Sequence, residues 1–126
     1  MKLNLGILED LFTIHRLSPK SEIPNQVYQS QFYSISKTDE ELSVICPSSV
    51  SLISEKSEAG WVGIKILGPL DFSLTGILAN ISAVLDKAKI SIFAISTFDT
   101  DYILVKSEKL SAAKKALEKD EYIFTN

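Results

Sequence analysis

The chain is poor in the residues that build cross-links and metal clusters. Its 126 residues include one cysteine, Cys46, and one histidine, His15. A single cysteine excludes an internal disulfide and a cysteine-based metal cluster, which agrees with the reducing cytoplasm. Because Cys46 follows two apolar residues and precedes a proline, we predict a packed core thiol at the end of a strand rather than a reactive one.

The chain also lacks an excess of positive charge and any long apolar run. Its formal net charge is −3 and its pI is about 5.1, so no basic field attracts phosphates and we predict that nucleic acid is not a partner. The apolar stretch 103–105 does not offer the aromatic, basic strand on which an RNA-recognition module stacks bases. No segment predicts a membrane span or a signal peptide. We therefore predict a soluble, cytoplasmic protein without a membrane partner.

No catalytic constellation is visible in the sequence. His15 lies in a strand-like segment with no cysteine nucleophile beside it, so we interpret it as a strand residue and not as a general base. Asp99 and Asp101 lack the glycine-bearing loop and the third ligand of a calcium site. The glycines at 60, 63 and 68 are not followed by the residues of a phosphate-binding loop. We predict no enzyme activity, no catalytic residue, no metal and no cofactor.

What the chain does contain is a regular order of strands and helices in its second half. Apolar and β-branched patterns predict strands at 61–67, 90–96, 101–106 and 122–124, the second of them buried. Helical spacing predicts a helix over 75–88, and Ser107 is the candidate N-cap of a second helix that ends near 119. The order strand, helix, strand, strand, helix, strand is that of the ferredoxin-like α+β fold.

The first half shows shorter and less regular elements. Strands are predicted at 3–7 and 11–15, with Glu9 and Asp10 interrupting them, and at 31–36 and 42–46, where Pro47 ends the last. The turn-rich stretch 18–25 predicts a loop with at most one helical turn near 24–28. The polar run 54–60 is the candidate linker, and it favours a division into units 1–58 and 59–126.

The two halves resemble each other around one hairpin. When ISKTDEEL at 35–42 is placed over ISTFDTDY at 95–102, a constant offset of 60 gives identities at Ile, Ser and Asp. A repeat at a fixed offset favours two copies of one structural unit, of which the first has lost most of its first helix. The alternative is a chance similarity between two short hairpins with polar turns.

Two stretches of the second half carry a family resemblance. They are GPLDFSLTGIL at 68–78 and ISIFAISTFDTDYILVK at 90–106, with FYSIS at 32–36 and ELSVICP at 41–47 in the first half. With these motifs the chain resembles the small tandem-ACT proteins of bacteria and archaea, and its second unit is similar to the ACT domains of aspartate kinases and of the CASTOR arginine sensors. The resemblance implies two tandem ACT-like units, a degenerate one over 1–58 and a complete ACT domain over 59–126.

The resemblance implies a regulatory protein and not an enzyme. ACT units of this kind bind small ligands, typically amino acids, at an interface between units, and they pair side by side, so a homodimer is expected. Such a sensor reports to a separate downstream protein that no motif identifies. The alternative is a degenerate ACT-like module that binds no ligand and serves dimerisation or contact with another protein, for which Trp61 is a candidate anchor.

The segment that begins the first helix of the second unit is the candidate seat for a ligand carboxylate. It contains Ser73, Leu74, Thr75, Gly76 and Ile77. Free backbone N–H groups and the positive end of the helix dipole suit an anion there. Gly76 permits close approach to the backbone, and Thr75 offers a cap or a hydroxyl. The alternative is a tight strand-to-helix entry that binds nothing.

The turn after the next strand supplies the candidate for the ligand ammonium. Asp101 lies near Thr97 and Phe98 in the sequence and can accept hydrogen bonds from an ammonium. The residues alone also allow a solvated turn carboxylate, which is our interpretation of Asp99. The resemblance assigns the ammonium to Asp101, because ligand-binding relatives carry an aspartate at the matching position.

The resemblance also bears on the ligand side chain. It implies that Ser91 and Ile92 touch the ligand from the facing unit. The arginine sensors carry acidic residues where this chain has Ser73 and Leu74, so a guanidinium would lack its bidentate partner here. We therefore predict an amino acid with an uncharged side chain. The apolar residues near the predicted site are Phe72, Leu74, Ile77 and Phe98.

Overall fold

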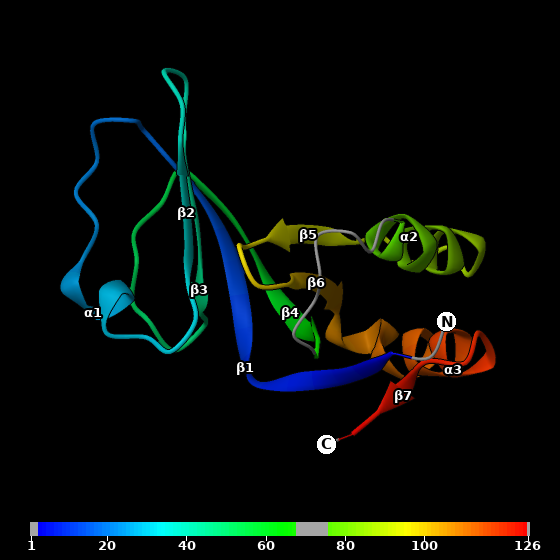
Figure 1. The fold of residues 1–126 in the computed structure, drawn as a ribbon. Coiled ribbons are helices and arrows are strands. Elements are labelled where there is room, and N and C mark those ends of the chain that lie inside the picture. Colours follow the sequence, from blue (N-terminus) through cyan, green and yellow to red (C-terminus); the bar gives the residue numbers. More distant parts are fainter. Residues whose placement is uncertain (1–2, 68–75, 126) are drawn as a thin grey trace. The chain divides into compact units, whose positions relative to one another are not determined.

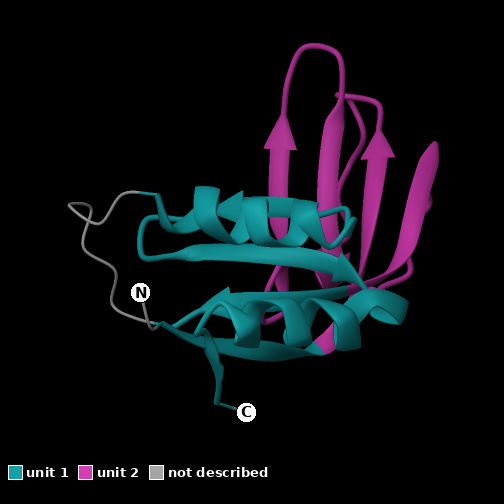
Figure 2. Ribbon diagram, turned by 90° about the vertical axis from the view of Figure 1, so that its right-hand side faces the viewer, with its two compact units in different colours: residues 1–9, 62–126 teal, residues 10–61 magenta. Residues whose placement is uncertain are grey.

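The computed structural model describes residues 3–67 and 76–125 (Figure 1). The chain separates into two compact units, which Figure 2 shows in different colours. Unit 1 consists of residues 1–9 and 62–126, and unit 2 of residues 10–61. Two strands, β1 (Asn4–Leu17) and β4 (Lys56–Ile66), have residues in both units.

Unit 1 has the predicted order of strands and helices. Strand β4 is followed along the chain by α2 (Ile77–Lys87), β5 (Phe93–Ser96), β6 (Asp101–Lys106), the 3-10 turn η1 (Ser107–Lys109), α3 (Leu110–Lys119) and β7 (Ile123–Phe124). Its strands lie in the order β7, β1, β4, β6, β5, with β5 and β6 antiparallel and β7 parallel to β1. The ferredoxin-like α+β fold is therefore confirmed, with β1 as an additional strand between β7 and β4.

The core of unit 1 lies between this sheet and its two helices. Helix α2 buries Ile77, Ile81 and Leu85, which recur every four residues along one face. Helix α3 buries Ala113 and Leu117 in the same way. They pack against strand residues that alternate along the helix-facing side of the sheet, namely Leu5, Ile64, Ile66, Ile103 and Val105. The helical stripes predicted from the sequence are confirmed.

Three predictions about elements of unit 1 and its border are wrong. The strand predicted over 90–96 begins only at Phe93, and it is a largely exposed edge strand, because among the strands that the structure describes it pairs with β6 alone. Ser107 is not the N-cap of α3, because a 3-10 turn precedes the helix and Lys109 takes the cap position without a side-chain hydrogen bond. The linker predicted over 54–60 is mostly strand, because β4 begins at Lys56 and carries its polar residues on exposed positions.

Unit 2 contains β2 (Ser34–Lys37), β3 (Leu42–Pro47), the second part of β1, the first part of β4 and one helical turn, α1 (Asn25–Tyr28). Strand β3 pairs antiparallel with both β2 and β1. Its core consists of Leu17, Val27, Leu42, Val44, Cys46 and Val50. The prediction of a packed thiol is confirmed, since Cys46 is fully buried and burial raises the pKa of its thiol. The predicted interruption of β1 at Glu9 and Asp10 is wrong, because the strand continues through both residues.

The two hairpins that resemble each other in sequence share one turn geometry. In the β2–β3 hairpin the N–H of Thr38 donates to the carbonyl of Glu41 at 2.9 Å. In the β5–β6 hairpin the N–H of Thr97 donates to the carbonyl of Thr100 at 2.8 Å. The threonine hydroxyls also bond within their own turns. Equivalent turn positions are therefore 59 residues apart, and not 60 as the sequence alignment predicts.

A shift of one residue exchanges the two faces of a strand. Ile35 pairs with Val44, and Ala94 pairs with Ile103, so both pairs lie on the core side of their units. Ile35 therefore corresponds to Ala94, whereas the sequence alignment placed it over Ile95. The predicted offset is wrong by one residue, and the tandem division into 1–58 and 59–126 stays a prediction.

Candidate ligand-binding site

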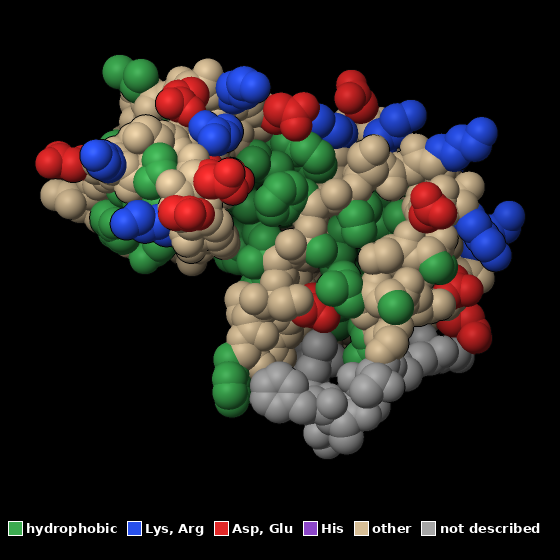
Figure 3. All heavy atoms as spheres, turned by 90° about the horizontal axis from the view of Figure 1, so that it is seen from above, with side chains coloured by type: hydrophobic (Ala, Val, Ile, Leu, Met, Phe, Trp, Pro, Cys, Tyr) green, Lys and Arg blue, Asp and Glu red, His purple; other side chains and the backbone are tan. Residues whose placement is uncertain are grey.

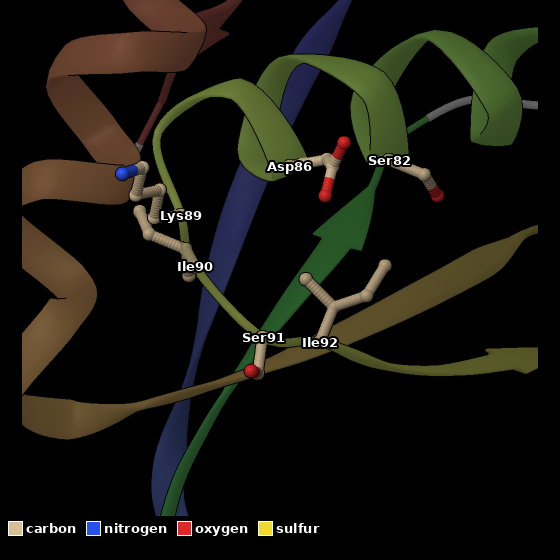
Figure 4. Close-up of a pocket in the computed structure, with 6 residues that line it drawn as sticks. All are labelled: Ser82, Asp86, Lys89, Ile90, Ser91 and Ile92. Carbon is tan, nitrogen blue, oxygen red and sulfur yellow. The ribbon is translucent and has the colours of Figure 1, made fainter.

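A surface hollow of about 620 Å³ lies at the end of α2 in unit 1 (Figure 4). Small-molecule sites commonly have volumes of roughly 300–1,000 Å³. The residues that line this α2 hollow are Ser82, Asp86, Lys89, Ile90, Ser91 and Ile92. Two of them, Ser91 and Ile92, are predicted ligand contacts.

The way α2 ends shapes one side of the α2 hollow. Lys89 takes a left-handed conformation with φ 61°, and its N–H donates to the carbonyl of Asp86 at 2.9 Å. The N–H of Ile90 donates to the carbonyl of Leu85, also at 2.9 Å. This pair of bonds is the Schellman motif, which closes a helix and reverses the chain direction. The motif buries Ile90 in the core and leads the next two residues back past the helix.

Polar groups from α2 point into the hollow above an apolar side chain. Asp86 and Ser82 lie four residues apart and therefore on one face of the helix. Figure 4 shows one oxygen of the Asp86 carboxylate directed toward Ile92, whose side chain points up toward the helix, and it shows the Ser82 hydroxyl on the same side of α2. The structure gives neither polar side chain a hydrogen bond or ion pair within the described part of the chain. The Lys89 amine lies on the other side of Ile90, away from the carboxylate.

Asp101 lies at the other end of β5, beside the hairpin turn. Its Oδ1 accepts a hydrogen bond from the Ser96 hydroxyl at 2.5 Å, and Oδ2 has no partner among the described residues. The Thr97 hydroxyl is engaged within the turn, where it donates to the Thr100 carbonyl at 3.0 Å. The Thr100 hydroxyl donates to the carbonyl of Ile66, which ties the turn to the end of β4.

Gly76 and Ile77 begin α2. Gly76 has φ 82°, a conformation that favours glycine, and its carbonyl accepts a hydrogen bond from the N–H of Asn80 at 2.8 Å. Ile77 belongs to the core, with 6% of its surface exposed, so it offers little area to a ligand. Phe98, in contrast, is 81% exposed. The remaining predicted residues, Phe72, Ser73, Leu74 and Thr75, lie outside the described residues.

The described site residues form two groups that one copy of the chain does not bring together. One group lines the α2 hollow, and the other surrounds Asp101, which pairs with Ser96 at the far end of β5. Four residues of extended chain separate Ile92 from Ser96, about 13 Å at 3.3 Å per residue. Sequence reasoning missed Asp86 and Ser82, because they lie on the polar face of a helix, where the sequence does not distinguish a site from solvated surface.

Neither the charges on the face shown in Figure 3 nor the metal-ligating side chains of the described residues add a further site. Figure 3 shows basic and acidic side chains mixed on one face, so the positive charges there do not gather into a phosphate-binding patch. No three His, Cys, Asp or Glu side chains of residues 3–67 and 76–125 gather in a way that could hold a metal ion. None of the helices described here is long and apolar enough to cross a membrane.

Residues 56–119, about half of the chain, match the sequence model of the ACT domain. The chain belongs to the ACT domain family. A second family model, that of an N-terminal domain, matches residues 10–51, which lie within unit 2. The resemblance found in the sequence motifs is thereby confirmed, and the βαββαβ elements of unit 1 are those of an ACT domain.

Relatives and solved structures extend this result. The chain is 30% identical over 124 residues to the cytosolic arginine sensor for mTORC1 subunit 1 of Pongo abelii, a match that covers 90% of this chain and 37% of that protein. The chain thus spans little more than a third of that relative. A crystal structure of an Agrobacterium tumefaciens protein is similar with a TM-score of 0.89 and 33% identity, covering 99% of this chain and 93% of that one.

The ACT fold also recurs in a regulatory subunit. The regulatory subunit of aspartate kinase from Thermus thermophilus, in its ligand-free form, has a TM-score of 0.61 to this chain. The match covers 90% of this chain and 96% of that one at 12% identity, so it shows a likeness of fold alone.

Proposed function

We propose that this protein is a regulatory amino-acid sensor, in which an ACT unit binds a free amino acid against an ACT unit of a second copy. The observation that carries the proposal is the ACT domain match over residues 56–119. An arginine sensor and an aspartate kinase regulatory subunit among the similar proteins support it. The proposed protein is cytoplasmic and non-catalytic, needs no cofactor or metal, and reports to a separate downstream protein.

The arrangement of β5 is the reason for placing the ligand between two copies. β5 is an edge strand that pairs with β6 alone among the described strands, so its other side is available to a second chain. Antiparallel pairing of two β5 strands sets the α2 hollow of one copy beside the turn of the other. Ile92 of one copy and Asp101 of its partner copy then contact a single ligand. Within one copy these two residues lie at opposite ends of a span of about 13 Å, roughly four strand residues, and do not contact the same ligand.

The two ends of β5 offer complementary parts of an amino-acid site. The unpartnered oxygen of Asp101 accepts a hydrogen bond from the ligand ammonium. The N–H groups that follow Gly76 at the start of α2 suit the carboxylate. Ile92 and Phe98 provide apolar surface for a side chain, which agrees with an uncharged amino acid.

The proposal extends to the first half of the chain. We propose that residues 1–58 are a degenerate ACT-like copy of residues 59–126. The shared turn of the β2–β3 and β5–β6 hairpins supports this origin, since both begin with a threonine that bonds three residues ahead. The test of this common origin is a variant in which the β5–β6 hairpin replaces the β2–β3 hairpin in the 59-residue register, followed by determination of its structure. Loss of the fold would contradict the equivalence of the two hairpins.

Thermal denaturation against the twenty amino acids at millimolar concentration tests the sensor function. A ligand a hundredfold above its Kd stabilises the folded state by about 2.7 kcal/mol, which raises the midpoint by roughly 5–15 °C. We expect a selective shift for an uncharged amino acid that disappears in Asp101→Asn. The same change at an exposed turn, Asp39→Asn, is the control and keeps the shift. A well-folded protein that no amino acid stabilises would instead be a ligand-free dimerisation or interaction module.

A further inference from the structure

The α2 hollow contains a carboxylate and a hydroxyl that the fold does not use. Asp86 and Ser82 lie in adjacent turns of α2 and line the same hollow as Ile92. The structure gives them no hydrogen bond or ion pair in the described part of the chain, whereas Asn80 on the same helix is bonded to both Asp120 and Tyr122. Polar groups that converge on a hollow without stabilising the fold are candidates for binding.

The position of Asp86 is unfavourable for the helix itself. It lies in the last turn of α2, where the helix dipole places partial negative charge and disfavours a carboxylate. Lys87 shares this last turn, but the carboxylate of Asp86 and the helix end both place negative charge beside the hollow. A bound cation is attracted by both.

The other residues that line the hollow indicate which part of a ligand lies next to its cationic group. Ile92 is partly buried and offers an apolar surface opposite the carboxylate. Lys89 also lines the hollow, but its amine lies beyond Ile90 and leaves the space beside Asp86 open. The hollow thus suits a cation carried on an aliphatic stem.

We propose that the α2 hollow binds the cationic end of the ligand, an ammonium or guanidinium on an aliphatic stem, through the carboxylate of Asp86 and the hydroxyl of Ser82. The inference rests on the proposed amino-acid sensing and adds two residues to it. An ammonium donates three hydrogen bonds in diverging directions, and the single carboxylate of Asp101, which also accepts a bond from Ser96, lies on only one side of it. The hollow of the facing copy supplies the missing acceptors.

NMR titration of the full-length 15N-labelled protein tests this proposal with four probes. They are L-leucine, L-arginine, 3-methylbutylamine, which is leucine without its carboxylate, and 4-methylpentanoate, which is leucine without its ammonium. We expect the amide signals of Ser91 and Ile92 to shift with the amine and with at least one amino acid, and to stay in place with 4-methylpentanoate.

Substitutions in the hollow complete the test. Asp86→Asn is nearly isosteric and changes an exposed residue, so the protein should fold, and we expect it to weaken binding about tenfold or more, as for hydrogen bonds to charged groups. Ser82→Ala should weaken it less. Asp39→Asn, the same change in unit 2, should leave it unaltered. If Asp86→Asn weakens the binding of both leucine and 3-methylbutylamine, the cation bound in the hollow is the α-ammonium. If it weakens the binding of arginine alone, the bound cation is the guanidinium of the arginine side chain.

The outcomes separate this inference from the proposed function. If leucine or arginine binds and Asp101→Asn abolishes binding while Asp86→Asn does not, the sensor function stands and the cation site is wrong. If 3-methylbutylamine occupies the hollow but no amino acid stabilises the protein, the cation site stands and the sensor function is wrong. A protein whose Ser91 and Ile92 signals respond to none of the probes overturns the cation site.

Discussion

His15 is a histidine inside an apolar core. It is 6% exposed and faces Val44 across the β1–β3 pair. Its Nδ1 lies 2.9 Å from the Ser54 hydroxyl, and its Nε2 has no hydrogen-bond partner within the described part of the chain. Burial lowers the pKa of the imidazole below its usual 6.5, because a charged ring is poorly solvated there. The neutral ring is therefore the form that the folded state favours.

This burial predicts that the protein loses stability as the pH falls below 6.5. The unfolded chain takes up a proton on the imidazole near pH 6.5, whereas the folded chain does so only at lower pH. Between these two values the unfolded state binds more protons, so the free energy of unfolding decreases as the pH falls and is fully regained above 6.5. Urea denaturation at pH 7.5, 6.5 and 5.5 measures the decrease.

The chain offers a clean control for that measurement. Since His15 is the only histidine, its ring signal in the proton NMR spectrum is assigned without ambiguity, and we expect a titration midpoint below 6.5. His15→Gln removes the titrating group and should flatten the pH dependence between 7.5 and 5.5. An equally steep dependence in His15→Gln would assign the effect to other groups.

At the scale of elements, both long helices end in the same motif without a glycine. Glu121 after α3 has φ 73°, and its N–H donates to the Glu118 carbonyl at 3.1 Å, while the N–H of Tyr122 donates to the Leu117 carbonyl at 3.1 Å. Lys89 takes the equivalent place after α2. The left-handed conformation costs a residue other than glycine about 1–2 kcal/mol.

We therefore expect Lys89→Gly and Glu121→Gly each to raise the free energy of unfolding by about 1 kcal/mol. Chemical denaturation measures the change, and the melting midpoint should rise by roughly 3–6 °C. Ala88→Gly, one position earlier with φ −82°, is the matched control and should lower stability by about 0.5–1 kcal/mol. Equal effects at 88 and 89 would show that the left-handed strain is not the cause.

The helices show how far the sequence predicts this fold. The helical period of 3.6 residues was enough to predict α2 and α3 and the apolar stripe of each. The helix ends predicted at 88 and near 119 lie within one residue of Lys87 and Lys119. The left-handed residues that follow them were not predicted, because Lys89 and Glu121 occupy positions that glycine normally marks. The strand predicted from residue 90 was too long for a related reason. Ile90 is apolar because it packs in the core after the end of α2, and β5 begins only at Phe93.

The candidate site was predictable in the same uneven way. Ser91, Ile92 and Asp101 came from family motifs, and the structure places the first two in a hollow. Asp86 was not predicted, because a carboxylate on the polar face of a helix carries no sequence signal of its own. Its relation to Ile92 depends on the reversal after α2, which is a property of the backbone.

At the scale of the molecule, pairing between distant segments was the least predictable feature. The alternation of residues 3–7 predicts a strand but not its partners, and in unit 1 this part of β1 lies between β4 and β7. Asn4 pairs with Ile123, more than a hundred residues away. Short-range patterns do not encode such a contact, because they show which face of a strand is buried but not which distant strand packs beside it.

The proposed pairing of two β5 strands gives the prediction that belongs to this scale. Ala94 is an exposed residue of that edge strand, and a lysine on an edge strand opposes pairing with another chain. We expect sedimentation to give twice the chain mass of 13.9 kDa for the natural protein and the single-chain mass for Ala94→Lys. Because the Ala94 side chain is exposed, although it lies on the helix-facing side of the sheet, the circular dichroism spectrum should stay unchanged.

The control for this substitution lies on the other exposed hairpin. Ser36→Lys places the same charge on β2, the edge strand of unit 2, and should leave the dimer intact. Since the ligand is proposed to lie between two copies, Ala94→Lys should also lose the amino-acid-dependent thermal shift, while Ser36→Lys keeps it. If the Ala94→Lys variant is a monomer that an amino acid still stabilises, the ligand lies within a single chain. If the natural protein itself sediments as a monomer, the proposal of a site shared by two copies is wrong.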